Sequence, residues 1–139
     1  CRRAFGHIPG AEVSDIEVRL GGTSYSINTV RALKEMYPDE QLFLLIGGDM
    51  LFSFDKWYKY ESLLKETRVC AVARDDDSLV DMMEYANEIG RVKVLPTQAV
   101  TMSSTQVRET VANGGDISEM VPAGVAEYIR EKGLYGGRN

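Results

Sequence analysis

The sequence predicts an α/β fold with an open parallel sheet and flanking helices. Short apolar runs alternate with segments in which apolar residues recur every three or four positions, the spacings typical of strands and helices. The intervals between successive runs are too long for hairpins and suit the crossovers that join parallel strands. A domain commonly holds about 100–200 residues, so we expect residues 1–139 to form one domain.

The first half of the chain contains three predicted strands and two predicted helices. Residues 16–20 alternate between apolar and polar types, which predicts a strand covered on one face. Residues 26–37 have helical spacing, and Pro38 directly after them stops the helix. The continuous apolar runs 41–46 and 69–73 predict strands buried on both faces, as in parallel sheets. Residues 57–64 between them again have helical spacing.

The second half continues the alternation. Residues 78–89 predict a helix, residues 92–95 a strand, and residues 103–113 a further helix followed by two glycines. Pro122 suits the first position of a last helix, and Gly133 follows its final turn. The elements therefore keep a strand-helix order through most of the chain.

Composition excludes several classes of protein. A hydrophobic content of 44% and a charged content of 27% are those of an ordinary globular chain. The net charge of −5 offers no broad footprint for nucleic acid. The longest apolar run, Leu42 to Ile46, is far shorter than the roughly 20 residues that span a bilayer. Cys1 and Cys70 make no disulfide framework, which indicates a reducing, cytoplasmic setting.

Ligands of open parallel sheets bind beyond the carboxyl ends of the strands, and Gly47-Gly48-Asp49 follows one such end. Glycines let a ligand approach the backbone, and the Asp49 carboxylate can accept hydrogen bonds from ribose hydroxyls. The tripeptide taken alone fits a turn followed by a helix N-cap better.

A second candidate site is Ser103-Ser104-Thr105, with Arg108 one helical turn later. A helix start offers unpaired N–H groups and the positive end of the helix dipole to a phosphate. Arginine adds a cationic fork suited to phosphate oxygens. Ser103 and Gln106 also have the spacing of a capping box, and the two interpretations are compatible.

Trp57-Tyr58, early in the predicted helix, is the third candidate, because an indole can stack on a planar heterocycle. A tryptophan that only covers the core is the commoner case. Arg74 ends a predicted strand and suits either a phosphate or an exposed carboxylate. Residues 75–77, three aspartates, fit a solvated turn, with a metal site as the alternative. His7 precedes every predicted strand and is interpreted as a loop residue without a catalytic role.

The order and spacing of these elements resemble bacterial nicotinate-nucleotide adenylyltransferases from about Val13 to Tyr135. The matching pieces are Thr23-Ser24-Tyr25-Ser26-Ile27, Leu45-Ile46-Gly47-Gly48-Asp49, Trp57-Tyr58, Ala73-Arg74, Met102 to Arg108, Val121-Pro122, Tyr128-Ile129 and Gly133-Leu134-Tyr135. The serine-threonine element with its arginine is shared by the wider nucleotidyltransferase superfamily. The Tyr25 segment and Trp57-Tyr58 favour the nicotinate member.

The resemblance implies a Rossmann-like fold and an enzyme that joins ATP to nicotinate mononucleotide, with Mg²⁺ on the phosphates. It further implies that Ser26, Trp57 and Tyr58 hold the nicotinate ring and its carboxylate, with Ser26 standing where the family usually has threonine. The implied contacts on the ATP side are Gly47 and Asp49 at the sugar or base, and Arg74, Ser103, Ser104, Thr105 and Arg108. No nucleic acid or membrane partner is implied, and homo-oligomerisation stays open.

One departure from the family lies at the front of the sequence. The family opens with a strand and a glycine-rich turn bearing HxGH, and residues 1–10 show no such motif, no strand and no helix cap. We therefore expect this chain to be the carboxyl-terminal part of an adenylyltransferase domain, inactive by itself. Two alternatives stay open: a pantetheine-phosphate or other nucleotidyltransferase, and a non-catalytic nucleotide-binding module.

Overall fold

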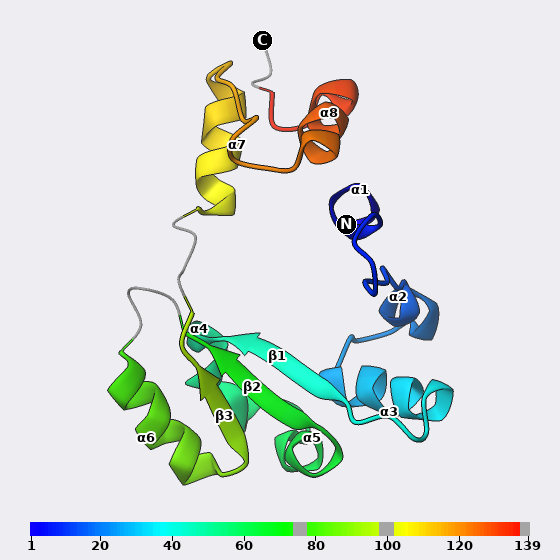
Figure 1. Ribbon diagram of the computed structural model, residues 1–139, viewed down its shortest axis with the longest axis vertical. Helices are drawn as coiled ribbons and strands as arrows, with labels where there is room; N and C mark the ends of the chain where they lie inside the picture. The colour runs from blue at the N-terminus through cyan, green and yellow to red at the C-terminus, as the bar shows by residue number, and fades with distance from the viewer. Residues whose placement is uncertain (74–77, 98–101, 137–139) are drawn as a thin grey trace. The chain divides into compact units, whose positions relative to one another are not determined.

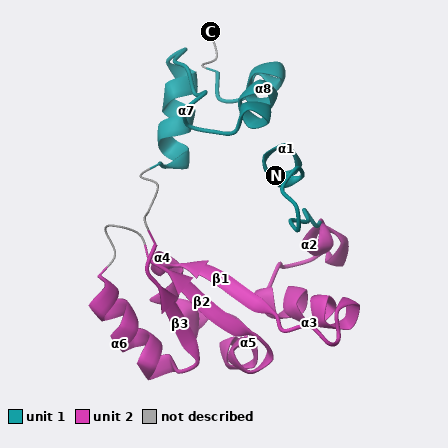
Figure 2. Cartoon of the chain, viewed as in Figure 1, with its two compact units in different colours: residues 1–14, 100–139 teal, residues 15–99 magenta. Residues whose placement is uncertain are grey.

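A computed structural model describes residues 1–73, 78–97 and 102–136. The chain divides into two compact units, coloured separately in Figure 2. Unit 1 consists of residues 1–14 and 100–139, and unit 2 of residues 15–99. The single domain expected over residues 1–139 stays a prediction.

Unit 2 is built on a three-stranded parallel sheet, as predicted (Figure 1). Its strands are β1 (Phe43–Gly47), β2 (Arg68–Val72) and β3 (Val92–Leu95), in the order β1-β2-β3. Gly47 pairs with Val72, and Val72 with Leu95, so all three strands end at one edge of the sheet. The segments that follow the strands therefore start from that carboxyl edge.

The described residues of unit 2 form six helical elements: α2 (Ile16–Leu20), α3 (Ser26–Met36), α4 (Gly48–Leu51), the 3-10 helix η1 (Phe54–Lys56), α5 (Tyr60–Glu66) and α6 (Leu79–Ile89). The predicted helices starting near Ser26 and Ser78 are confirmed. Ser78 explains the start of α6, because its hydroxyl accepts a hydrogen bond from the Asp81 N–H at 3.3 Å.

The core of unit 2 lies on one face of the sheet. Side chains of α3, α5 and α6 pack there against alternate strand residues, among them Ile46, Val69 and Ala71. The prediction that the first of the long apolar runs is buried on both faces is wrong within the described structure, because Phe43 and Leu45 are both 64% exposed. A period of two places them opposite the helices. Cys70 is buried and free, as expected.

The prediction of a strand at residues 16–20 is also wrong, since these residues form α2. Only Ile16 of this segment is buried, and Val18 is 82% exposed. An ion pair at 2.9 Å joins Arg19 to Asp15 one helical turn earlier. The apolar side chains of this segment thus pack against no sheet. The ion pair between residues four apart is a contact typical of a helix.

Trp57 and Tyr58 do not lie early in a helix, contrary to the prediction. Trp57 has extended backbone angles (φ −71°, ψ 142°) at the end of η1. Lys59 then takes a left-handed conformation (φ 54°) before α5 begins at Tyr60. Helical spacing was present because α5 continues it, but a left-handed residue interrupts a right-handed helix.

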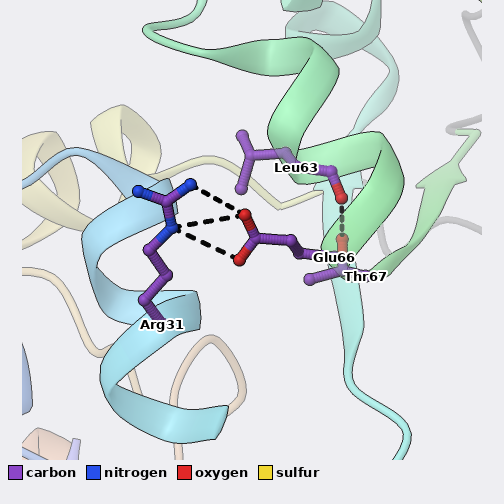
Figure 3. A network of polar contacts seen from close by, with 4 residues as sticks. All are labelled: Arg31, Leu63, Glu66 and Thr67. Atoms are coloured by element: carbon purple, nitrogen blue, oxygen red, sulfur yellow. Dashed lines mark hydrogen bonds and ion pairs between the residues drawn. The ribbon is translucent and has the colours of Figure 1, made fainter.

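A polar network joins α3 to α5, and Figure 3 shows its residues. The Arg31 guanidinium donates to the Glu66 carboxylate through Nη2 at 2.8 Å and Nε at 3.2 Å. Hydrogen bonding from Arg31, aided by its charge, holds the pKa of Glu66 below its usual range, although burial opposes this. Next to Glu66, the buried Thr67 hydroxyl donates to the Leu63 carbonyl at 2.8 Å and closes the end of α5.

We expect Glu66→Gln to lower the free energy of unfolding at pH 7 by no more than about 1 kcal/mol, because Arg31 is largely exposed and solvent screens the pair. A carboxyl whose pKa is depressed in the folded state stabilises it above the unfolded pKa, and this stabilisation is lost as pH falls through the folded pKa. The difference between wild type and variant should therefore shrink as pH falls below the ordinary glutamate pKa of about 4.3, and close below the lower pKa of the folded state. Urea denaturation at several pH values measures it.

Glu35→Gln is the matched control. Glu35 is an exposed carboxylate of α3, and its replacement removes the same charge. A stability difference for Glu66→Gln that equals that of Glu35→Gln, or that persists in acid, would contradict a role for the ion pair.

Unit 1 is helical, with α1 (Arg2–Phe5), α7 (Ser104–Ala112) and α8 (Ala123–Lys132). Its core cluster is Val107, Ile117, Ala126 and Ile129. The predicted helices are confirmed, except that Pro122 is the N-cap of α8 and not its first residue. Gly133 ends α8 in the left-handed conformation (φ 58°) that glycine adopts at little cost. In the described parts of both units, we find no helix with the length and apolarity needed to span a membrane.

Candidate functional site

A cavity of about 380 Å³ in unit 2 brings together Ser26, Trp57 and Tyr58, the three residues predicted to hold a nicotinate group. Its lining consists of Ser24, Tyr25, Ser26, Lys56, Trp57, Tyr58 and Leu63. One side comes from the segment that enters α3, and the other from the turn between η1 and α5. The chain passes from β1 through α4 and η1 to this turn, and then through α5 back to β2.

Aromatic rings shape the cavity. Tyr25 and Tyr58 lie with their ring centroids 4.4 Å apart and so connect its two sides. Trp57 is half-buried, and its ring contacts that of the fully buried Phe54 at 5.2 Å. The indole therefore rests on the core through one part of its surface and contributes to the cavity lining through another. A supported flat ring is what stacking on a planar heterocycle requires.

The cavity presents positive rather than negative charge. Among the described residues that line it, Lys56 is the one cation and none carries a carboxylate. Helix α3 begins at Ser26, and its N-cap Tyr25 provides no side-chain capping hydrogen bond. The first amides of a helix have no acceptor inside it and carry the positive end of the dipole. Such a lining favours an anion that carries a flat ring.

Gly47 and Asp49 lie at the carboxyl end of β1, as expected of residues that meet a nucleotide. A Cβ atom at position 47 would lie 2.6 Å from Asp49 Oδ1, so the exposed carboxylate of Asp49 turns back against the strand end. The same arrangement fits the start of the short helix α4, which the sequence analysis favoured for this tripeptide. Their nucleotide contact stays a prediction.

The start of α7 in unit 1 contains the other predicted phosphate ligands. Ser103 and Gln106 form the predicted capping box, with hydrogen bonds of 3.1 Å and 2.7 Å between each side chain and the other's backbone N–H. The box uses one N–H of the first turn and leaves those of Ser104 and Thr105 without an acceptor inside the helix. Arg108 Nη2 donates to Thr105 Oγ1 at 3.0 Å, which turns the guanidinium toward the same helix end.

The remaining residues singled out from the sequence contribute nothing to the described site. Arg74 and the three aspartates at 75–77 lie outside the described residues. His7 is exposed between α1 and α2, and no role follows from its position. Within residues 1–73, 78–97 and 102–136, no group of three or more His, Cys, Asp or Glu side chains is placed to hold a metal ion.

Four described residues of the lining were not predicted from the sequence: Ser24, Tyr25, Lys56 and Leu63. Two of them bear on ligand binding, Tyr25 as a ring partner of Tyr58 and Lys56 as a charged lining residue. Both are direct neighbours of residues that the sequence analysis had singled out, Ser26 and Trp57. Their position in the sequence beside these residues could have indicated them. In a regular helix or strand, however, adjacent side chains point in different directions, so neighbours face one cavity only where the backbone is irregular. Both segments are irregular here.

Comparisons with known proteins show the family of this chain. Residues 9–110 match the family model described as cytidylyltransferase-like. A probable nicotinate-nucleotide adenylyltransferase of Thermosipho melanesiensis is 37% identical over 99% of this chain and 69% of its own length. One of the same name from Gemmatimonas aurantiaca is 34% identical over 96% of this chain and 65% of its own length. The chain belongs to the nicotinate-nucleotide adenylyltransferase family.

A solved structure extends the likeness to the fold. The Plasmodium falciparum nicotinic acid mononucleotide adenylyltransferase complexed with APC has a TM-score of 0.66 at 17% identity, over 89% of this chain and 64% of its own. The parallel sheet with flanking helices is accordingly the Rossmann-like fold of these adenylyltransferases, as the resemblance implied. The chain spans about two thirds of the length of the relatives named here.

Proposed function

We propose that this chain forms the mononucleotide pocket and part of the ATP site of an enzyme that makes nicotinate adenine dinucleotide in NAD biosynthesis. The substrates are ATP, which arrives with Mg²⁺ on its phosphates, and nicotinate mononucleotide. The observation that carries the proposal is the joint lining of one cavity by Ser26, Trp57 and Tyr58. Family membership supports the reaction class, and a free, buried Cys70 is compatible with the cytoplasm, where we place the protein.

In the acceptor pocket, the indole of Trp57 stacks on the pyridine ring. The ring carboxylate faces the start of α3, where the Ser26 hydroxyl and the first amides of the helix donate hydrogen bonds. Tyr58 completes the wall together with Tyr25. This arrangement recognises a planar, negatively charged ring and holds the mononucleotide in one orientation.

On the ATP side, the hydroxyls of Ser103, Ser104 and Thr105, the first amides of α7 and the Arg108 guanidinium bind phosphate oxygens. Gly47 and Asp49 meet the sugar or base, and Arg74 is assigned to the same substrate. The donors at α7 are hydroxyls, amides and a cation, which suit phosphate oxygens rather than a metal ion.

The reaction is a direct displacement. A phosphate oxygen of nicotinate mononucleotide forms a bond to the α-phosphorus of ATP, and the bond from that phosphorus to the bridging oxygen of the β-phosphate breaks. Pyrophosphate leaves with the electron pair, and no covalent enzyme intermediate forms. The chain contributes by holding the reactants in line and by neutralising charge on the phosphates, which account for much of the catalysis in such transfers.

Two measurements test the proposal. Trp57 is the single tryptophan, so its fluorescence should change saturably when nicotinate mononucleotide is added to the chain. The protein encoded by the complete gene should release pyrophosphate from ATP and nicotinate mononucleotide. Saturable nucleotide binding without turnover in that protein would instead indicate a non-catalytic module, and turnover with phosphopantetheine alone would indicate another transferase.

We expect Arg108→Ala to weaken ATP binding about tenfold, the loss of roughly 1.4 kcal/mol that a hydrogen bond to a charged group supplies. Arg108 is exposed on α7, so the free energy of unfolding should change by less than about 0.5 kcal/mol. Calorimetric titration with ATP and urea denaturation measure the two effects.

Lys132→Ala is the control for this variant, because it removes the same charge from an exposed position on α8. A collapsed melting temperature for Arg108→Ala with unchanged ATP affinity would show that the arginine stabilises the helix and does not bind phosphate.

A further inference from the structure

Lys56 is a charged residue of the cavity to which nothing above assigns a role. It is exposed at the end of η1, directly before Trp57. Its side chain makes no hydrogen bond or ion pair with any described residue. Lysine ammonium groups carry three donors, and this one lies at a cavity whose described lining contains no carboxylate.

The acid adjacent to Lys56 in the sequence is engaged elsewhere. Asp55 accepts a hydrogen bond from the Tyr85 hydroxyl at 2.9 Å. Burial is the main cause that raises the pKa of Tyr85, and this hydrogen bond is the second. Glu66 is paired with Arg31. The other lysine of the turn, Lys59, lies over the ring of Tyr58, with its ammonium 5.1 Å from the ring centroid. Lys56 alone of these charged groups combines a place in the cavity lining with the lack of a described partner.

We propose that Lys56 selects the acid form of the substrate, by pairing with the carboxylate on a ring stacked on Trp57. The inference rests on the proposed function and goes beyond it by naming the residue that discriminates a carboxylate from the corresponding amide. An ammonium attracts a carboxylate and gains no charge interaction from a neutral amide. Lys56 adjoins Trp57 in the chain, and both residues line the same cavity, so the long lysine side chain can reach a group carried by a ring stacked on the indole.

The mononucleotide carries a second anion, its phosphate, which offers the same ammonium the same chemistry. The phosphate must lead away from the stacked ring toward ATP, whereas the carboxylate is attached to the ring itself. The two sources are separated by comparing nicotinate mononucleotide with nicotinamide mononucleotide, because these ligands share the phosphate and differ in the carboxylate.

The experiment measures both dissociation constants by Trp57 fluorescence and by calorimetry, for wild type and for Lys56→Met. We expect the preference for the acid over the amide to fall about two- to fivefold in Lys56→Met, the range of an exposed ion pair. Lys56→Arg should keep most of the preference. In wild type the preference should shrink between 0.1 and 1 M salt, as the screening length drops from about 10 Å to about 3 Å.

Lys65→Met is the matched control. Lys65 is an exposed lysine of α5 outside the cavity lining, and its replacement removes the same charge. Equal weakening of both ligands by Lys56→Met would assign the lysine to the phosphate and overturn the proposal. An unchanged preference, or the same change in Lys65→Met, would overturn it as well. If wild type binds neither ligand, the proposed function itself fails, a result distinct from either of these.

Discussion

Replacing Phe54 with alanine should destabilise the chain by about 3–5 kcal/mol, the cost of truncating a fully buried aromatic side chain. Phe54 is 0% exposed and lies in the core cluster of unit 2. Its ring contacts those of Trp57 at 5.2 Å and Tyr60 at 6.3 Å, so truncation removes support from two neighbours as well as apolar burial. Since a domain is typically stable by about 5–15 kcal/mol, the variant should unfold at a much lower urea concentration.

Phe52→Ala is the control for this truncation. Phe52 is 43% exposed, and its ring contacts only Tyr85 among the described aromatic pairs, at 5.6 Å. The same atoms are removed from a position that buries less apolar surface, so the loss should be well below that of Phe54→Ala. Equal losses for the two variants would show that Phe54 is not a central core residue.

Replacing Trp57 with alanine should weaken the binding of nicotinate mononucleotide by about 1–3 kcal/mol, roughly five- to 150-fold, because a base stacked on an aromatic side chain is worth that much. Calorimetry is the measurement of choice, since the variant has no other tryptophan to report binding. ATP affinity should change little, because the predicted ATP ligands lie elsewhere in the chain.

Trp57→Phe is the companion variant, and its smaller ring should preserve part of the affinity. Trp57 is half-buried and packs on the core, so urea denaturation must accompany the titrations. Unchanged affinity of a folded Trp57→Ala protein for the mononucleotide would argue against ring stacking. The alternative of a phosphopantetheine or other nucleotide acceptor would then become the stronger interpretation.

Features specified by neighbouring residues were predictable from the sequence. The capping box of Ser103 and Gln106 and the cap at Ser78 each depend on side chains within three positions of the backbone group they bind. The parallel strands were recognisable from apolar runs and from the lengths between them. The ordered motifs were enough to identify the family, because that inference needs residue identity and spacing but no contact between distant segments.

Features that depend on packing were not predictable in this way. The alternation at residues 16–20 is typical of a strand, but a short helix with only Ile16 buried accommodates the same residues. The helix forms because no neighbouring strand pairs with this segment in the described structure. Burial on both faces of β1 was inferred from apolar content, yet Phe43 and Leu45 are exposed, because the packed helices lie on the opposite face. An apolar pattern does not specify how many layers cover a sheet.

The sequence by itself determined the alternation of β1, β2 and β3 with helices, several helix ends and the family to which the chain belongs, because these depend on residue identity and short-range bonding. The tertiary structure alone decided that Ser26 and Trp57, from separate segments, line one cavity, and that Lys56 joins them there without an acidic partner among the described residues. The physical reason is that this proximity arises from the crossover between β1 and β2 and from the left-handed turn at Lys59, which aim side chains in directions that periodicity does not encode.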